Sequence, residues 1–229
     1  MEKIIRETIL GVEFDALTLE EAVARGLVYA QDQTKKHIVV TPNPEIVLYA
    51  QKDKKYRDLL NKASMSLPDG IGILWASAFK NRIIPHGKLK ERVTGVDFMT
   101  HLVSAMSDRK IKIFLLGAEL GIAQKVKEIF EKKYPPISIV GTDSSSPNNE
   151  DFPEIKAKID TSGAHVLFVA FGAPKQEEWI FSHIQNLPTI RLAVGVGGAF
   201  DFIAGKRKRA PVFMRKLGFE WFWRLIQQP

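Results

Sequence analysis

Short apolar runs rich in β-branched residues alternate along the chain with amphipathic stretches of about ten residues or more. The short runs predict strands and the longer stretches predict helices, and their alternation is typical of βα units in a parallel sheet. We therefore expect an α/β fold. The predicted strands cover 38–41, 65–67, 111–116, 137–141, 166–171 and 192–196, and the predicted helices cover 19–31, 44–61, 70–79, 96–107, 121–134, 153–162 and 174–184.

Two segments fit this pattern less well. Residues 7–14 carry Gly11 in their middle, which fits either a bent strand or a hairpin. Residues 80–92 are polar and basic and contain Pro85 and Gly87, so they predict a loop between helices. That loop is long for a compact domain, which makes it a candidate lid.

The composition narrows the class of protein. A chain of 229 residues that is 45% hydrophobic can bury one sizeable core, with room for one small appended segment. The absence of Cys excludes disulfides, thiolate chemistry and Cys-based zinc sites, and it agrees with a reducing cytoplasm. The N-terminal residues do not resemble a signal peptide, and the longest apolar run, 166–173, is too short to cross a bilayer. Any membrane contact should therefore be superficial.

The positive charge is concentrated at the C-terminal end. The chain has a net charge of +7, and residues 205–229 hold seven basic side chains against one acidic side chain. Aromatic residues lie among these cations. A basic, aromatic segment of this kind is typical of binding to phosphate groups, whether in nucleic acid, anionic lipid or a diphosphate substrate. We therefore divide the chain into a catalytic α/β domain over 1–204 and a basic, aromatic, helical segment over 205–229.

Two motifs join a predicted strand to a predicted helix. In TPNPE, Asn43 is a good helix N-cap, but this local role leaves the hydroxyl of Thr41 unexplained at the strand end. In LPDGIGI, Asp69 is a good N-cap too, and its carboxylate could also accept a proton from a sugar hydroxyl. Ligands of parallel sheets collect at the carboxyl ends of the strands. Thr41 and Asp69 are therefore candidate catalytic residues.

Two further motifs lie at later strand ends. FGAPKQE combines a turn at Gly172 with Gln176, whose amide can donate to and accept from a base or a sugar. GVGGAFD fails the dinucleotide fingerprint because Phe200 occupies the third glycine position, and GKR at 205–207 fails the P-loop motif. A glycine-rich strand end nevertheless lets a nucleotide lie against bare backbone. The candidate nucleotide-binding residues are Gly172, Gln176, Gly195, Gly197, Gly198 and Asp201.

No recognisable metal site is present in the sequence. It contains no Asp-x-Asp triplet, and its five His residues show no ligand spacing. Many enzymes that use sugar nucleotides bind the diphosphate through a metal at such a triplet. Without it, the charge on a departing diphosphate would have to be met by Arg, Lys and helix amides. We therefore expect no metal and no cofactor.

In combination, TPNPEIV, LPDGIGI, ERVTGVD, LLGA, FVAFGAPKQE, GVGGAFD and GKRKRAP resemble the TagA/WecG family, glycosyltransferase family 26. The blocks follow the family's order from residue 38 to about 225. The resemblance implies a Rossmann-like domain with helices on both faces of the sheet. It also implies metal-independent, inverting transfer of N-acetylmannosamine from UDP-ManNAc to undecaprenyl-diphosphate-GlcNAc. This transfer builds the linkage unit of wall teichoic acid, and the resemblance places it at the inner face of the bacterial membrane.

The resemblance also assigns roles to residues. Asp69 matches the family's general base, and Thr41 matches its polar partner. Asn43, Arg92 and Gln176 match substrate-pocket positions, and Gly195 to Asp201 match the nucleotide side. The candidate membrane and diphosphate contacts are Lys206, Arg207, Lys208, Arg209 and Arg224. The resemblance implies that family members usually continue beyond the aromatic segment, so we expect this chain to be truncated, which leaves its full activity open.

Several alternatives remain open. The donor could be UDP-ManNAc-uronic acid, as in synthesis of enterobacterial common antigen, because no residue in the sequence identifies a carboxylate reader. A nucleic-acid-binding protein would explain the basic segment but not the strand-end motifs. A noncatalytic nucleotide-binding regulator would explain those motifs but not the basic segment. The oligomeric state is also open.

Overall fold

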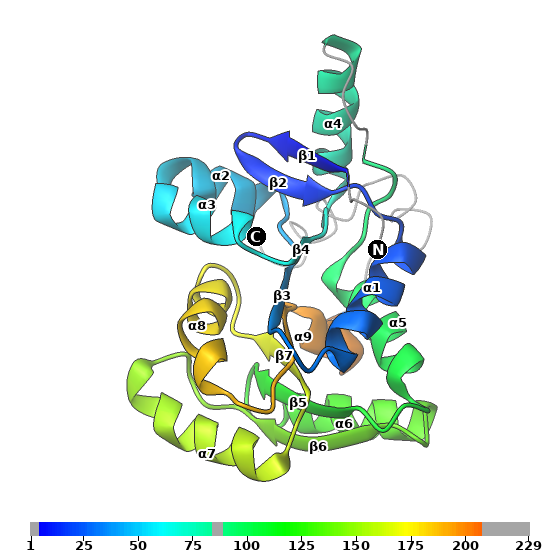
Figure 1. Cartoon of the computed structure of the whole chain (residues 1–229), viewed down its shortest axis with the longest axis vertical. Helices are drawn as coiled ribbons and strands as arrows, with labels where there is room; N and C mark the ends of the chain where they lie inside the picture. The colour runs from blue at the N-terminus through cyan, green and yellow to red at the C-terminus, as the bar shows by residue number, and fades with distance from the viewer. Residues whose placement is uncertain (1–4, 84–88, 208–229) are drawn as a thin grey trace.

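A computed structural model describes residues 5–83 and 89–207 (Figure 1). Its centre is a six-stranded sheet in the order β4-β3-β8-β7-β5-β6, in which every neighbouring pair is parallel. This confirms the predicted α/β fold. The strands are β3 (His37–Val40), β4 (Met65–Ser66), β5 (Lys112–Gly117), β6 (Ser138–Asp143), β7 (Val166–Ala170) and β8 (Leu192–Gly195).

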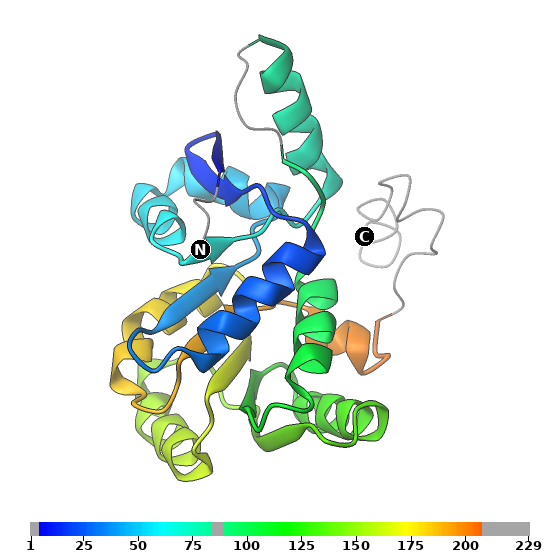
Figure 2. The ribbon, with the colours of Figure 1, turned by 45° about the vertical axis from the view of Figure 1, so that its right-hand side comes forward.

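Helices cover both faces of the sheet, because the strand side chains alternate between two hydrophobic clusters. Val39 points into one cluster, and its neighbours Ile38 and Val40 point into the other. The first cluster is covered by α1 (Leu19–Gln31), α5 (Gly95–Met106), α6 (Ile122–Lys133) and α9 (Ala199–Ile203). The second is covered by α2 (Pro44–Lys52), α3 (Lys54–Asn61), α7 (Phe152–Ser162) and α8 (Lys175–His183). Figure 2 shows α1 and α5 side by side on the first face.

The single helix predicted over 44–61 is wrong, because Asp53 divides it. The backbone of Asp53 is extended, and its N–H donates to the carbonyl of Tyr49 at the end of α2. Its side chain then accepts from the N–H of Tyr56 and begins α3. An Asp side chain competes with helix continuation by capping a new helix, which explains the break.

The segment that left a bent strand or a hairpin open is a hairpin. Strands β1 (Arg6–Ile9) and β2 (Val12–Asp15) pair antiparallel around a turn in which Leu10 and Gly11 both have positive φ. Gly11 adopts this backbone conformation at little cost. The hairpin buries Phe14 completely against the second cluster.

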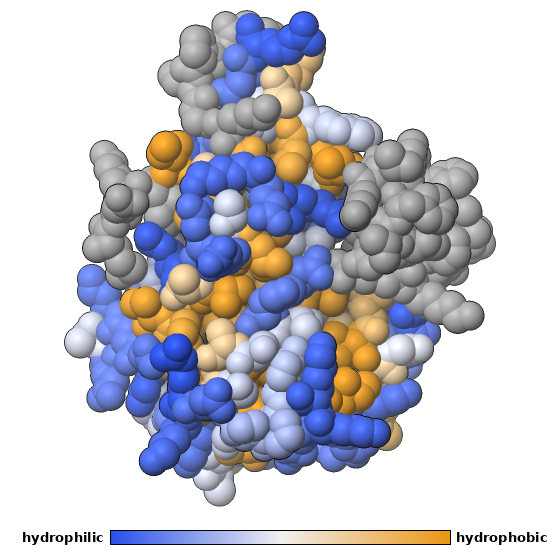
Figure 3. Space-filling model, turned by 90° about the vertical axis from the view of Figure 1, so that its right-hand side faces the viewer, coloured by the Kyte–Doolittle hydropathy of each residue, from blue (hydrophilic) through white to orange (hydrophobic). Residues whose placement is uncertain are grey.

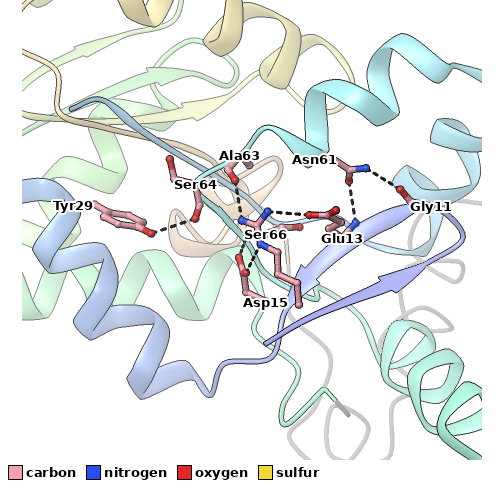
Figure 4. Close-up of polar contacts among 9 residues, drawn as sticks. Gly11, Glu13, Asp15, Tyr29, Asn61, Ala63, Ser64 and Ser66 are labelled. Atoms are coloured by element: carbon pink, nitrogen blue, oxygen red, sulfur yellow. Dashed lines mark hydrogen bonds and ion pairs between the residues drawn. The ribbon is translucent and has the colours of Figure 1, made fainter. Parts of the chain in front are cut away.

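A polar network attaches this hairpin to β4 (Figure 4). The carboxylate of Asp15 accepts from Arg6 Nε at 2.8 Å and from the backbone N–H of Ser66 at 2.7 Å. Arg6 also donates to the carbonyl of Ala63 at 3.1 Å. Burial raises the pKa of Asp15, although these donors and the charge of Arg6 oppose the rise. The network fixes the strand that leads to Asp69.

Helix α4 (Ile71–Ile83) extends further than the predicted 70–79 and projects from the body of the molecule (Figures 1 and 2). Its inner side is held by Ser77, whose hydroxyl donates to the buried carboxylate of Glu7 at 2.6 Å. The same carboxylate accepts from the N–H of Leu89 at 3.2 Å. The loop predicted over 80–92 is therefore wrong at its start, where 80–83 are helical, and residues 84–88 lie outside the described part.

Within the described residues, none of the helices combines the length and the apolar character needed to cross a membrane. The face shown in Figure 3 carries hydrophilic residues with apolar areas between them rather than one continuous apolar surface.

Candidate functional site

A cavity of about 370 Å³ opens where four strands end. It is lined by Thr41 after β3, Asp69 after β4, Gly172 after β7 and Gly197 after β8. These four positions come from four separate sequence motifs, and the structure brings them to one place. This position is typical of ligand sites in open α/β sheets.

The sheet order explains why the cavity lies here. Strands β3 and β8 are neighbours, but α2 follows β3 on one face and α9 follows β8 on the other (Figure 1). The two connections therefore diverge and leave a crevice between them.

Thr41 is buried beside the glycine-rich turn. Its hydroxyl donates to the carbonyl of Gly195 at 3.2 Å. A Cβ on Gly95, at the start of α5, would lie 3.2 Å from the same Thr41 oxygen and 3.4 Å from the carbonyl of Val196. Thr41 thus links β3, the turn after β8 and the start of α5, while it also lines the cavity.

Asp69 lines the same cavity. One of its carboxylate oxygens accepts from the N–H of Gly95 at 3.1 Å, so Asp69 contacts a helix other than the one that follows it in sequence. The following residue, Gly70, has a φ of +135°, and a Cβ there would lie 2.9 Å from the ring of Pro44. This close approach brings Asp69 next to the start of α2.

Asn43 is the N-cap of α2, as the sequence predicts. Its side-chain oxygen accepts from the N–H of Ile46 at 2.9 Å, and Pro44 follows at the first helical position. Asn43 also lines the cavity. Its contribution to substrate binding stays a prediction.

Gln176 is buried, and its amide contacts other parts of the protein. Its Nε2 donates to Glu177 at 2.6 Å, and its Oε1 accepts from the N–H of Gly197 at 2.9 Å. Glu177 in turn accepts from the hydroxyl of Tyr56 at 2.9 Å. Burial raises the pKa of Glu177 to about 7, although the hydrogen bonds from Gln176 and Tyr56 oppose the rise. Burial and the nearby Glu177 carboxylate raise the pKa of Tyr56.

A second cavity, of about 510 Å³, lies on the other side of the same glycines. Gly172, Gly197 and Gly198 line both cavities, whereas Asp201 lines only the second of the two. Arg207 lines both and places its Nε 3.3 Å from the Asp201 carboxylate.

The remaining predicted residues are distributed as follows. Gly195 is buried beneath Gln176, and half-buried Arg92 precedes α5 without lining either of the two cavities. Lys206 forms an ion pair with Glu119. Lys208, Arg209 and Arg224 lie outside the described residues.

Gly195 must lack a side chain at this point. A Cβ there would lie 3.0 Å from Gln176 Nε2 and 3.2 Å from Glu177 Oε1. We predict that Gly195→Ala lowers the free energy of unfolding by about 1–2 kcal/mol, because a well-packed site resists an added methyl group. Urea unfolding measures this, with Gly198→Ala as a control: a methyl group there would meet its nearest neighbour, Phe202, only at 4.0 Å, and the φ of Gly198 is −75°. Equal losses in the two variants would contradict a packing origin.

Among the residues that the structure describes, no three His, Asp or Glu side chains are grouped so that they could hold a metal ion. The start of α2, the start of α5 and the glycine-rich turns border the cavity. Helix N-termini favour anionic ligands. The site therefore suits a phosphate-bearing ligand.

Comparison with known proteins identifies the family. The sequence profile of the glycosyl transferase WecG/TagA/CpsF family matches residues 7–229. The chain belongs to this family. It is 34% identical over 219 residues to the N-acetylglucosaminyldiphosphoundecaprenol N-acetyl-beta-D-mannosaminyltransferases of Staphylococcus aureus strains MRSA252 and NCTC 8325, covering 95% of this chain and 83% of each relative.

Family membership confirms the resemblance drawn from the motifs and identifies the chain as a glycosyltransferase. The structure adds two residues that the sequence motifs did not assign to the site, Glu177 and Tyr56. Glu177 was passed over because it follows Gln176 on a helix whose buried side is not evident from the motif. Tyr56 was missed because it comes from a helix 121 residues away in sequence from Glu177.

Proposed function

We propose that this WecG/TagA/CpsF-family protein transfers N-acetylmannosamine from UDP-ManNAc to GlcNAc linked to undecaprenyl diphosphate. The observation that carries the proposal is the cavity that joins Thr41, Asp69 and the glycines after β7 and β8, in a chain whose relatives are named for this transfer. The acceptor hydroxyl and the donor sugar would meet beside Asp69.

The reaction is a displacement at the anomeric carbon. The acceptor oxygen forms the new glycosidic bond while the bond from the sugar to UDP breaks, and Asp69 takes the hydroxyl proton. Attack on the side opposite the leaving group inverts the configuration. UDP departs as an anion, whose charge can be met by backbone amides of the glycine-rich turns and by Arg207. The nucleotide would occupy the side of Asp201.

The test is incubation of the protein with UDP-ManNAc and a GlcNAc-diphospholipid. Mass analysis should show a lipid product larger by one N-acetylhexosamine. UDP-ManNAc-uronic acid serves as the comparison donor. Faster transfer of the uronic acid would replace the proposed donor, and transfer of neither sugar would contradict the proposed function.

We predict that excess chelator leaves the rate of this transfer unchanged, because cationic side chains and amides can stabilise the departing diphosphate without a metal. The control is the same assay with added magnesium or manganese. Loss of activity in chelator, restored by either ion, would overturn this prediction.

We also propose that the protein works at an anionic membrane surface, because its acceptor is lipid-linked and its C-terminal segment is basic. Two of the four cations in 206–209 are already ion-paired with Glu119 and Asp201.

Changing 206–209 to Ser should weaken co-sedimentation with anionic liposomes, most strongly at low salt. Changing the exposed Lys54 and Lys55 to Ser should not. Binding that ignores lipid charge would contradict the proposal.

A further inference from the structure

A buried chain of polar side chains connects α3 to the glycine-rich turn. The Tyr56 hydroxyl donates to Glu177, Gln176 Nε2 donates to the other oxygen of Glu177, and Gln176 Oε1 accepts from the N–H of Gly197. Tyr56, Gln176 and Glu177 each expose 2% or less of their surface. This side-chain network ends at the backbone of the glycine-rich turn, which lines both cavities.

The ionised carboxylate gives this network its direction. A carboxylate only accepts hydrogen bonds, so the NH₂ group of Gln176 must face Glu177 and its Oε1 must face Gly197. If the amide rotated by half a turn, its NH₂ would meet the N–H of Gly197, donor against donor. The Gly197 N–H and an ionised Glu177 therefore favour the same amide orientation, and Glu177 holds the NH₂ end of Gln176 in place.

The turn rests directly on this pair. Gly195 leaves space for both Gln176 Nε2 and Glu177 Oε1, which would lie 3.0 Å and 3.2 Å from a Cβ at that position. Thr41, at the end of the neighbouring strand β3, donates to the carbonyl of the same Gly195. A change in the orientation of Gln176 would therefore reach the backbone between the two cavities.

We propose that Glu177 is a positioning residue that acts through Gln176 to fix the Gly195–Gly198 turn for the nucleotide-diphosphate part of the donor. The inference rests on the proposed function, because it assigns that turn to the donor. Glu177 does not touch the reacting atoms in this assignment. Tyr56 assists by holding the second oxygen of the carboxylate.

A role in helix capping does not account for Glu177. An acidic residue in the first turn of α8 is favourable, but the exposed Glu178 next to it supplies the same charge at no cost of burial. Burial opposes ionisation of Glu177, as its raised pKa shows. The carboxylate is therefore explained better by the hydrogen-bond direction that it imposes.

The test compares Glu177→Gln and Glu177→Leu, with Glu178→Gln as the matched control. Gln keeps an oxygen that can accept from Gln176, whereas Leu keeps none. We expect exchange of the Gly197 amide hydrogen, followed by NMR, to quicken about tenfold or more in the Leu variant and less in the Gln variant. The affinity for UDP should fall and the KM for the donor should rise, each by about tenfold in the Leu variant and by less in the Gln variant. The change in kcat should be smaller.

The pH dependence gives a second readout. The groups that contact the Glu177 carboxylate are Tyr56 from α3 and Gln176 on α8, with Tyr49 of α2 behind Tyr56. The exposed Glu178 acts on Glu177 only through its charge, which adds the smallest contribution to the raised pKa. A protonated Glu177 is a weaker acceptor for the NH₂ group of Gln176, so it holds Gln176, and through it Gly197, less firmly. Donor KM of the unchanged protein should therefore rise as the pH falls below about 7, and this rise should be absent from both Glu177 variants.

The outcomes separate the two proposals. If Gly197 exchange and UDP affinity are unchanged in Glu177→Leu, or change equally in Glu178→Gln, the positioning role is overturned. If Gly197 responds as expected but no sugar is transferred, the positioning role stands and the proposed function fails. If Leu disrupts folding, Glu177→Gln decides: wild-type Gly197 exchange and wild-type pH dependence of KM together would reject the proposal.

Discussion

Asp69→Asn should lower the turnover of sugar transfer by about two to four orders of magnitude, because the amide cannot accept the proton of the attacking hydroxyl. Asp69 lines the cavity, and one of its oxygens accepts from the N–H of Gly95. The carbonyl oxygen of Asn can still accept that hydrogen bond. The start of α5 should therefore be preserved, and the affinity for UDP should change by less than about threefold.

The matched control for this variant is Asp53→Asn. Asp53 is also an acidic residue whose side chain accepts from the start of a helix, but it does not line the cavity. Because Asn caps a helix about as well as Asp, the control should keep both stability and transfer. If Asp69→Asn retained most of its turnover, Asp69 would be reduced to a residue that orders α5.

The sequence predicted the sheet well because each strand pattern is local. Runs such as 166–171 are apolar and β-branched and are followed by a turn residue, so hydrophobic patterning alone identifies the strand. The break at Asp53 was not predicted, because the surrounding residues all favour a helix and only the capping geometry divides them. The end of α4 was misplaced for a similar reason: Lys80 and Asn81 look like loop residues, but both side chains bond to β1.

The candidate site was predictable as far as the strand ends. Thr41, Asp69 and Gly172 each follow a recognisable strand, and parallel strands deliver their carboxyl ends to one edge. The partners of these residues were not predictable. The contact from Asp69 to Gly95 and the contact from Tyr56 to Glu177 depend on how helices pack, and no local pattern records that packing.

The buried carboxylate of Glu177 has a consequence for stability that is separate from its effect on the donor. Its pKa is raised from 4.5 to about 7 in the fold, so the folded protein holds this proton more tightly than the unfolded chain does. The stabilisation from the proton is therefore complete below about pH 4.5 and is lost as the pH rises through about 7. Asp15, whose pKa is also raised, contributes in the same direction at lower pH.

Glu177→Gln should remove this pH dependence and make the protein more stable than the unchanged chain at about pH 8, by up to about 3 kcal/mol. The reason is that an amide is never ionised, so no charge has to be buried above pH 7. Chemical unfolding of both proteins between about pH 5 and pH 8 measures the difference, and subtracting the two curves cancels the other titrating groups. Glu178→Gln, at an exposed position, should leave the curve of the unchanged protein almost as it is.

A Glu177→Gln variant that is less stable at every pH would mean that the hydrogen bonds from Tyr56 and Gln176 outweigh the burial of the charge, and the carboxylate would then serve the fold itself. A variant that is more stable at pH 8 but binds UDP more weakly would instead show that the buried charge lowers stability and serves ligand binding.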